Sequence, residues 1–387
     1  MPVAVVRDNN IKSGLQQLFA GLGFTPGRRV FIKPNLCGRE PILPGENTSV
    51  QVMDALIAVL QERSCAEIVI CHGQLLGSFD HNVPFNEMLQ VSGFKKYSHM
   101  AGVAMVNLDD LPQQTILSLN GEVALHLPLE YMQGFDTYIN LAKIKTHMET
   151  TVSLSMKNQM GLAAQADRIE MHRTDLDGMI AELALHCRPH VSILEGYPAM
   201  EGLGPHHGKP RSLNLLAAGT DMVELDSLVC ALLGYTPRAI EHLSRAVALC
   251  VGRWCEDKDV QRFGNLGVSD FKKAASVFRY GTKILAYPTR SCSRCIHAVN
   301  TAGRAFKKQP LAYWRVLLKC MFSRRRINIV FGNAGDLEFN TQESLVCVGR
   351  CTRKIALRHG VAYLDKCPPG VDETREFIVS GILSKKR

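Results

Sequence analysis

Residues 139–162 read INLAKIKTHMETTVSLSMKNQMGL and give the clearest indication of both fold and function. The apolar start predicts a buried strand in which Lys143, Lys145 and His147 occupy alternate positions. Side chains two residues apart lie on one face of a strand, so we expect these three on the same face. Like charges on one face repel one another unless an anion, a carbonyl oxygen or a reacting group lies opposite. The stretch therefore predicts a sheet strand that carries a site for a negatively charged group.

Strands and helices alternate on both sides of this stretch. Short apolar runs predict strands at 3–6, 29–33, 67–71, 138–141, 191–194 and 213–218, and periodic segments predict helices at 12–22, 52–60, 175–186 and 222–233. Thr48 and Gln51 have the spacing of a capping box ahead of the second helix. This alternation is typical of an α/β fold, a mostly parallel sheet with flanking helices. In such sheets, ligands bind beyond the carboxyl ends of the strands.

The chain changes character after about residue 267: residues 271–335 contain no Asp or Glu, and paired cysteines appear. We predict an α/β domain at 1–265 and a smaller, basic, cysteine-bearing α/β domain at 266–387, with strands at 326–331, 344–348 and 361–364. A length of 387 residues also exceeds what one core usually supports.

The composition, with 46% hydrophobic and 21% charged residues, is that of a soluble globular protein. The N-terminus lacks the pattern of a secretory signal, and no apolar run reaches the length of a membrane span. We therefore expect a cytoplasmic protein with no transmembrane segment.

The formal net charge of +9 is concentrated in residues 271–335, which contain no Asp or Glu. This segment is either a solvated basic face or a docking surface for an acidic electron-transfer protein, an anionic substrate, a lipid surface or nucleic acid. Aromatic residues do not alternate with the charges as they do on nucleic-acid platforms, so nucleic acid ranks last.

Thirteen cysteines is a high number for a cytosolic chain, and disulfides are rare in a reducing compartment. Closely spaced pairs and a cysteine before proline suggest a metal or iron–sulfur site at Cys292, Cys295, Cys347, Cys351 and Cys367. One centre needs four of these five. We expect an iron–sulfur cluster of the 4Fe-4S type, with zinc as the alternative cofactor and a group of buried thiols as a third reading.

Polar and basic residues also collect at the predicted strand ends. Lysines there can bind phosphate or carboxylate, and a desolvated lysine can act as a base or nucleophile. Equally, such residues can cap strands, face water or protect an edge strand. A loop rich in glycine and proline is expected at 195–210, and its Glu201, His206 and His207 are further candidates for proton exchange or metal binding.

Five stretches in order resemble the family called domain of unknown function 362. They are IKPNL at 32–36, NLAKIKTH at 140–147, LSMKNQMGL at 154–162, MEGLGPHHG at 200–208 and AGTDMVELD at 218–226. The resemblance implies an α/β domain. Members often carry iron–sulfur clusters in an added ferredoxin-like segment, whose dense cysteine run this chain lacks.

These observations assign roles. The candidate catalytic residues are Lys143, Lys145, His147, Lys157 and Glu201, and the candidate cofactor-binding residues are Lys33, Asn35, Asn140, Asn158 and Asp221. The first hypothesis is a redox or redox-dependent enzyme that acts on an anionic small molecule. The alternatives are a non-redox isomerase, ligase or transferase with structural zinc or no metal, and an accessory protein that delivers a cluster or cofactor.

Overall fold

The computed structural model describes residues 3–37, 42–73, 75–78, 81–121, 123–206, 208–264, 266–267, 269–273, 277–280, 282–289, 291, 293–309, 311–322, 326–332, 337–340 and 343–383. The chain divides into two compact units, residues 1–274 and 275–387. The sequence predicted the boundary at 265, somewhat earlier. We call these parts the first and the second unit and describe each by itself.

The first unit is built on a ten-stranded sheet. Its main path runs in the order β14 (Val260–Phe263), β1 (Val3–Arg7), β13 (Leu215–Gly219), β11 (Val191–Glu201), β9 (Thr137–His147), β2 (Arg29–Pro34), β3 (Glu67–His72) and β6 (Val103–Asn107), with β10 (Thr151–Ser153) beside β9 and β12 (Lys209–Arg211) beside β11. The five strands from β11 to β6 are mutually parallel, whereas β13 is antiparallel to both of its neighbours. The mostly parallel α/β fold predicted from the sequence is confirmed.

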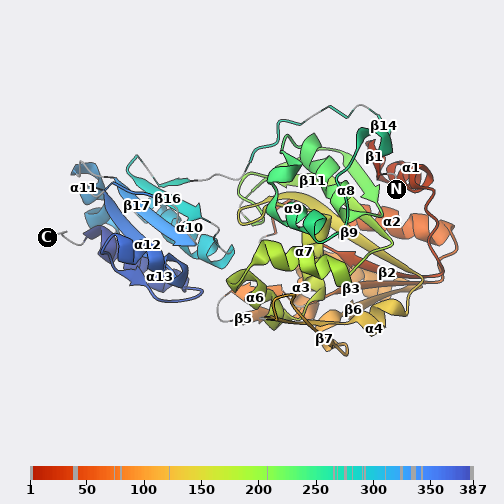
Figure 1. Cartoon of the computed structure of the whole chain (residues 1–387), viewed down its shortest axis with the longest axis horizontal. Coiled ribbons are helices and arrows are strands. Elements are labelled where there is room, and N and C mark those ends of the chain that lie inside the picture. Colours follow the sequence, from red (N-terminus) through yellow and green to blue (C-terminus); the bar gives the residue numbers. More distant parts are fainter. Residues whose placement is uncertain are drawn as a thin grey trace. The chain divides into compact units, whose positions relative to one another are not determined.

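Helices cover both faces of this sheet (Figure 1). They are α1 (Ile11–Leu22), α2 (Val50–Glu62), α3 (Phe85–Ser92), α4 (Leu129–Gln133), α5 (Ser155–Asn158), α6 (Gln165–Arg173), α7 (Leu176–His186), α8 (Met222–Leu232) and α9 (Glu241–Ala248). Two small hairpins, β4 (Leu75–Ser78) with β5 (His81–Val83) and β7 (Gln114–Leu117) with β8 (Ala124–Leu127), complete the unit. Neighbouring residues of one strand enter different cores: Phe31 packs in the core beside α7 and α8, and Ile32 in the core beside α1 and α2.

Two local predictions need correction. The residue that caps α2 is Ser49 rather than Thr48, because the Thr48 hydroxyl instead donates to the carbonyl oxygen of Leu141 and accepts from the amide of Asn35. The first part of the loop expected at 195–210 is strand: β11 continues to Glu201, with a register shift against β9 between Glu195 and Met200.

The second unit, teal to blue in Figure 1, contains a five-stranded sheet. Its strands lie in the order β15 (Phe278–Tyr280), β16 (Ile284–Thr289), β17 (Ile327–Gly332), β18 (Ser344–Val348) and β19 (Tyr363–Leu364), and its helices are α10 (Ser293–Lys308), α11 (Trp314–Phe322), α12 (Arg353–Arg358) and α13 (Val371–Leu383). The four strands from β16 to β19 are parallel. Their carboxyl ends therefore lie at one edge of the sheet, which matters for the cysteines below.

Among the residues that the structure describes, no helix is long and apolar enough to cross a membrane.

Candidate functional site

Two loops lie directly on the carboxyl ends of β9 and β11. A Cβ atom at Gly204 would lie 2.1 Å from the carbonyl oxygen of Thr146, and one at Gly45 would lie 2.5 Å from that of Ala199. Gly45 also has a φ of +87°, which favours glycine. Side chains at these two positions would push the loops away. The glycines therefore let segments 43–48 and 202–206 close over the strand that carries the lysines.

Lys143 forms a fully buried ion pair with Glu195, from the neighbouring strand. Its ammonium also donates to the hydroxyl of Ser49 at 2.8 Å and to the carbonyl oxygen of Pro198 at 3.0 Å. Burial lowers the pKa of Lys143, and the carboxylate of Glu195 opposes that shift. An ammonium has three donors, and all three are used here. Lys143 therefore holds β9, β11 and the start of α2 together, and we do not assign it a reacting role.

Lys145 lies among possible metal ligands. Its Nζ donates to Sγ of Cys37 at 2.8 Å and to the carbonyl oxygen of Glu46 at 2.9 Å. The carboxylate of Glu46 in turn pairs with Nδ1 of His206. One ligand atom from each of Cys37, Glu46 and His206 lies within 4.8 Å of the other two, and no other trio of His, Cys, Asp or Glu does so among the described residues. His207, its sequence neighbour, lies outside the described residues.

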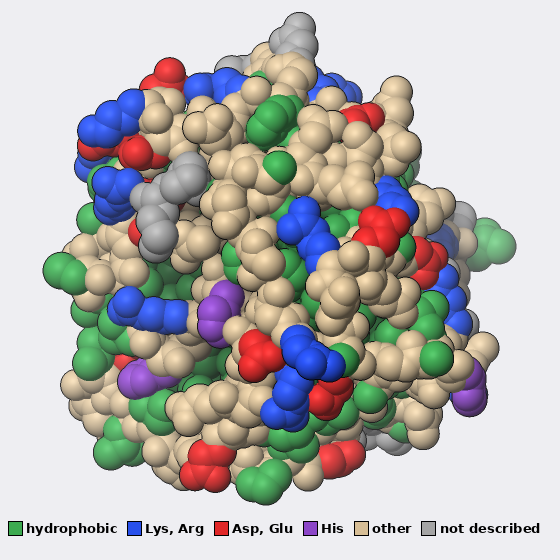
Figure 2. Space-filling model, turned by 90° about the vertical axis from the view of Figure 1, so that its right-hand side faces the viewer, with side chains coloured by type: hydrophobic (Ala, Val, Ile, Leu, Met, Phe, Trp, Pro, Cys, Tyr) green, Lys and Arg blue, Asp and Glu red, His purple; other side chains and the backbone are tan. Residues whose placement is uncertain are grey.

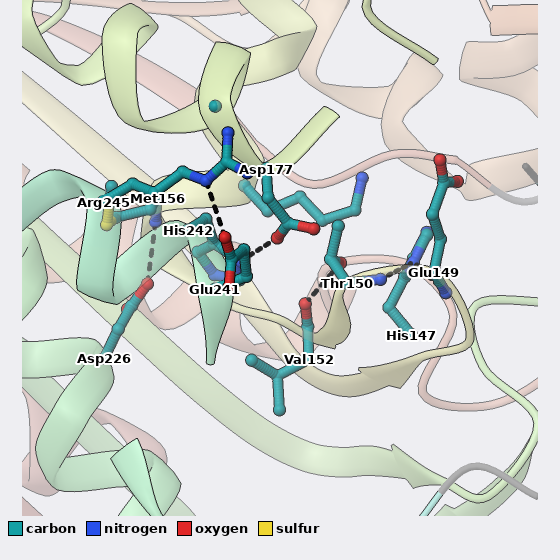
Figure 3. Close-up of polar contacts among 12 residues, drawn as sticks. His147, Glu149, Thr150, Val152, Met156, Asp177, Asp226, Glu241, His242 and Arg245 are labelled. Atoms are coloured by element: carbon teal, nitrogen blue, oxygen red, sulfur yellow. Dashed lines mark hydrogen bonds and ion pairs between the residues drawn. The ribbon is translucent and has the colours of Figure 1, made fainter. Parts of the chain in front are cut away.

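His147 and Lys157 are both buried, at 4% and 9% exposed, and Lys157 is the most exposed of the four lysines of the site. Nδ1 of His147 accepts from the amides of Glu149 at 3.2 Å and Thr150 at 3.3 Å (Figure 3), which leaves the ring proton on Nε2. Burial and the nearby Lys157 lower the pKa of His147 well below its usual value, so the ring is neutral. Burial also lowers the pKa of Lys157 to about 8. Its Nζ donates to the thioether of Met160 at 3.2 Å, a weak acceptor.

Lys33 lies beside a glycine that it requires. Its side chain is 1% exposed, and Nζ donates to the carbonyl oxygen of Pro34 at 2.9 Å. A Cβ atom at Gly161 would lie 2.5 Å from that Nζ. Burial, followed by the charge of Arg168, lowers the pKa of Lys33 to about 7. A substantial fraction of Lys33 is therefore a neutral amine near pH 7, next to the neutral ring of His72.

Three asparagines link the strands to α5. Nδ2 of Asn158 donates to Oδ1 of Asn140 at 2.8 Å, and Oδ1 of Asn158 accepts from Nδ2 of Asn35 at 3.1 Å. Asn140 also donates to Ser192 on β11. Oδ1 of Asn35 is buried and has no hydrogen-bond partner among the described residues. The asparagines thus position the site, and Asn35 keeps one acceptor for a ligand.

Asp226 holds the other end of α5. Its buried carboxylate accepts from the amides of Ser155 and Met156, both at 3.0 Å, and Figure 3 shows the contact with Met156. Burial raises the pKa of Asp226 to about 6. The sequence placed Asp226 in a family-like motif but assigned it no role. Its position shows how Lys157, one residue beyond Met156, is fixed relative to the sheet.

Two predicted site residues have other contacts. Glu201 accepts a hydrogen bond from the amide of Lys272 at 3.1 Å. Asp221 caps α8 by accepting from the amides of Val223 and Glu224. Because Asp221 follows β13, which is antiparallel to β11, it lies at the opposite edge of the sheet from Lys143. We therefore define the lysine site without these two residues; it comprises Lys33, Cys37, Glu46, Lys143, Lys145, His147, Lys157 and His206.

The second unit places cysteines at the carboxyl edge of its parallel sheet. Cys295 lies in the first turn of α10 after β16, Cys351 follows β18, and Cys367 follows β19. Cys292 also follows β16 but lies outside the described residues. We call Cys295, Cys351 and Cys367 the cysteine edge.

Cys347 differs from the cysteines of that edge. It lies within β18 and packs in an apolar cluster with Val330 and Ile355. Burial raises the pKa of the Cys347 thiol to about 12. Its position and its chemistry are those of a core residue.

The loops that carry the cysteine edge lie close together. A Cβ atom at Gly349, whose φ is +91°, would lie 3.6 Å from Sγ of Cys295 and 3.7 Å from the carbonyl oxygen of Lys366. That carbonyl accepts from the amide of Arg350 at 3.1 Å. The hydroxyl of Ser291, just before Cys292, is buried without a hydrogen-bond partner among the described residues. Glycine at 349 therefore leaves room beside the Cys295 sulfur.

The comparisons with known proteins concern the first unit. The model of the family described as domain of unknown function (DUF362) matches residues 30–231. The chain is also 28% identical over 262 residues to Thylakoid-associated protein sll1697 of Synechocystis sp., a match that covers 62% of this chain and 76% of that protein. The matched family range includes every residue of the lysine site and none of the cysteine edge.

Proposed function

The chain belongs to the DUF362 family, and from that premise we propose that it is an iron–sulfur protein with a redox or redox-dependent enzymatic role. One observation carries the proposal: a parallel sheet directs Cys295, Cys351 and Cys367 to a single edge. Thiolates from several loops at one edge are the ligand set that an iron–sulfur cluster requires. We place the protein in the cytoplasm, where thiols stay reduced.

We propose Cys292, Cys295, Cys351 and Cys367 as the four ligands of a 4Fe-4S cluster, which would supply one-electron transfer. Cys347 is excluded because it is a core thiol. Arg350 lies near Cys367, and its charge favours the thiolate form. A tetrahedral zinc ion also binds four thiolates. Zinc therefore stays the alternative cofactor at this edge, and the metal analysis below distinguishes it from a cluster.

We further propose that the lysine site binds an anionic small molecule through a phosphate or carboxylate group. Lys157 is the residue we expect to hold or activate it, since its side chain is 9% exposed and its amine has a weak acceptor. His147 would offer an Nε2 proton, because its Nδ1 is already an acceptor. A neutral ring that donates can stabilise developing negative charge without adding to the positive charge of the lysines.

The cluster proposal is tested by preparing the full chain without oxygen and measuring visible absorption, iron and sulfide. We expect brown protein with iron and sulfide in equal amounts. Cys351→Ser is expected to lose the colour, and Cys347→Ser, the matched control on the adjacent strand, is expected to keep it. Colourless wild-type protein that cannot be reconstituted would contradict the proposal, as would loss of colour in Cys347→Ser alone.

The substrate proposal is tested separately by titrating phosphate, sulfate and short dicarboxylates into the full chain and following its thermal unfolding. We expect at least one of these anions to raise the unfolding temperature of the first unit. Lys157→Met is expected to abolish that rise, whereas Lys95→Met, which removes an exposed lysine, leaves it unchanged. An equal response in both variants would show that the anion binds elsewhere.

A second candidate function rests on the trio Cys37, Glu46 and His206. Three mixed ligands with an open fourth position are typical of catalytic zinc, so this arrangement favours a non-redox enzyme that polarises a bound anion. Lys145 would then donate to the Cys37 thiolate. Stoichiometric zinc that is lost in His206→Ala and retained in Cys351→Ser would establish this alternative. Metal that is unaffected by His206→Ala would reject it.

A further inference from the structure

An apolar stripe runs along the outer face of α11 in the second unit. Its residues and their exposed fractions are Leu311 at 89%, Trp314 at 56%, Leu318 at 41%, Met321 at 71% and Phe322 at 80%. Large apolar side chains this exposed in a row differ from singly scattered surface residues and mark an interaction surface. The proposed cluster and the lysine site make no use of them.

The spacing of these residues makes one continuous face. Trp314, Leu318 and Met321 stand at positions i, i+4 and i+7 of α11, with Phe322 beside Leu318 one turn on. Leu311 lies one turn before Trp314. At 3.6 residues per turn, the four residues within α11 project within an arc of about 100°. The stripe is therefore the width of a face that a helix normally buries.

The opposite side of α11 is already packed. Val316 is buried, and α11 lies against α13. Tyr313, in the turn before the helix, makes an edge-to-face contact with Phe306 of α10, with ring centroids 5.1 Å apart. These contacts fix the helix to its unit with the apolar stripe directed outward.

The charged residues of the chain segment that carries the stripe are of one sign. Arg315 and Lys319 border one side of it on α11, and exposed Lys308 and Arg326 lie in the segments before and after it. Residues 271–335 contain no acidic residue at all. By contrast, Figure 2 shows a face of the molecule where Lys and Arg side chains are interspersed with Asp and Glu. The segment that carries the stripe therefore complements a surface of negative charge.

We propose that α11 docks the protein onto the surface of an anionic lipid bilayer, with the stripe inserted among the acyl chains and the flanking cations at the headgroups. A helix with a wide apolar face bordered by Lys and Arg, and with Trp in that face, is the form that interfacial helices take. The negatively charged cytoplasmic leaflet attracts such cations. An acidic electron-transfer protein would pair with the basic side chains, but its charged surface would not bury the five large apolar side chains of the stripe.

The test uses the full chain with Trp254→Phe, which leaves Trp314 as the only tryptophan. Vesicles of phosphatidylcholine, with and without about one quarter phosphatidylglycerol, are added at low and high salt, and binding is followed by sedimentation and by Trp314 emission. We expect binding to the anionic vesicles with a blue shift, and weaker binding at high salt because the flanking charges are screened.

The decisive variant is Leu318→Ser with Phe322→Ser, which we expect to weaken binding at least tenfold. Its matched control is Leu119→Ser with Leu357→Ser, which removes two other leucines exposed at 64% and 67% and is expected to bind like the parent chain. Equal binding by both variants would overturn the proposal, as would binding without an emission shift. Failure of the parent chain to bind, with self-association that the Leu318→Ser and Phe322→Ser variant loses, would show a second copy to be the occupant.

Discussion

The lysine site and the cysteine edge share their place at the carboxyl ends of parallel strands but differ in how far loops cover them. Each lies beyond the carboxyl ends of parallel strands, β2 and β9 in the first unit and β16, β18 and β19 in the second. In the lysine site, loops close over the strands and many polar atoms are paired within the protein, as in the buried pair of Lys143 and Glu195. At the cysteine edge, Cys351 is exposed and Gly349 leaves room beside Cys295.

The difference shows that the sheet topology brings similar side chains to one edge, and that the burial and partners of each side chain then separate structural residues from candidates for chemistry. In the first unit, Lys143 and Lys157 stand near the same sheet edge, but Lys143 has three good acceptors and Lys157 has a thioether. In the second unit, Cys347 and Cys351 are four residues apart, but only Cys347 enters the core. Each pair contrasts a structural residue with a candidate for chemistry.

The largest effect is expected from breaking the buried pair of the lysine site. Glu195→Gln leaves the ammonium of Lys143 without its counter-charge, so we expect unfolding of the first unit to become easier by about 3–5 kcal/mol. Urea unfolding followed by Trp254 emission in a Trp314→Phe background reports this unit alone. Glu62→Gln, which breaks the exposed pair with Lys12, should cost less than about 1 kcal/mol. Similar costs for the two variants would contradict the structural role of Lys143.

The pH dependence of the free energy of unfolding distinguishes the buried Lys33 from surface lysines. Its pKa is lowered in the folded state to about 7, so between pH 7 and 10 the unfolded chain binds more protons and stability rises with pH. One such proton corresponds to a slope of up to about 1.4 kcal/mol per pH unit. Because the pKa of Lys157 is also lowered, to about 8, Lys33→Met should reduce this rise rather than abolish it, and the exposed Lys95→Met should leave it unchanged. Urea unfolding at pH 7, 8, 9 and 10 measures it, and an unchanged slope in Lys33→Met would refute the assignment.

Substitution of Cys347 and of Cys351 should have different effects on the stability of the second unit as well as on metal binding. Cys347→Ser places a hydroxyl in an apolar cluster and is expected to destabilise the metal-free second unit by about 1–3 kcal/mol. Cys351→Ser changes an exposed residue and should cost less than about 0.5 kcal/mol. Trp314 emission during urea unfolding of the metal-free chain, in a Trp254→Phe background, gives both values. The reverse order would place Cys347 at the edge and Cys351 in the core.

A smaller effect on stability is expected for Asp221, and it tests whether this residue is part of the lysine site. Asp221→Ala removes the acceptor at the start of α8 and should cost about 1 kcal/mol, the usual value for a lost helix cap. Anion binding at the lysine site should be unchanged, because Asp221 lies at the other edge of the sheet. Thermal unfolding with and without the anion checks both points. Loss of anion binding would restore the cofactor-binding role predicted from the sequence.

The sequence predicted the fold well, because the fold follows from local patterns. Apolar runs and helical periodicity indicated the strands around Ile32 and Ile193, and alternate spacing indicated the row of Lys143, Lys145 and His147. What local patterns could not predict are contacts across the chain. Glu195 pairs with Lys143 because of the register of β11 against β9, and no spacing within one segment reveals that register.

The same limit explains the residues that sequence reasoning missed. Cys37 and Glu46 meet His206 because two loops fold onto neighbouring strand ends. The one available signal for Cys37 was its place just after the strand that ends at Pro34. Asp221 was predicted to bind a cofactor, and in the structure its carboxylate caps α8; a Gly-x-Asp start of a helix has the same sequence in either role.

The most direct test of the account is the metal content of two variants prepared side by side without oxygen, Cys351→Ser from the cysteine edge and Cys37→Ser from the lysine site. Iron, acid-labile sulfide and zinc are measured per chain. The account predicts that Cys37→Ser keeps iron and sulfide in equal amounts and that Cys351→Ser loses both. Iron that persists in Cys351→Ser, or zinc that is lost only in Cys37→Ser from an iron-free protein, would contradict it.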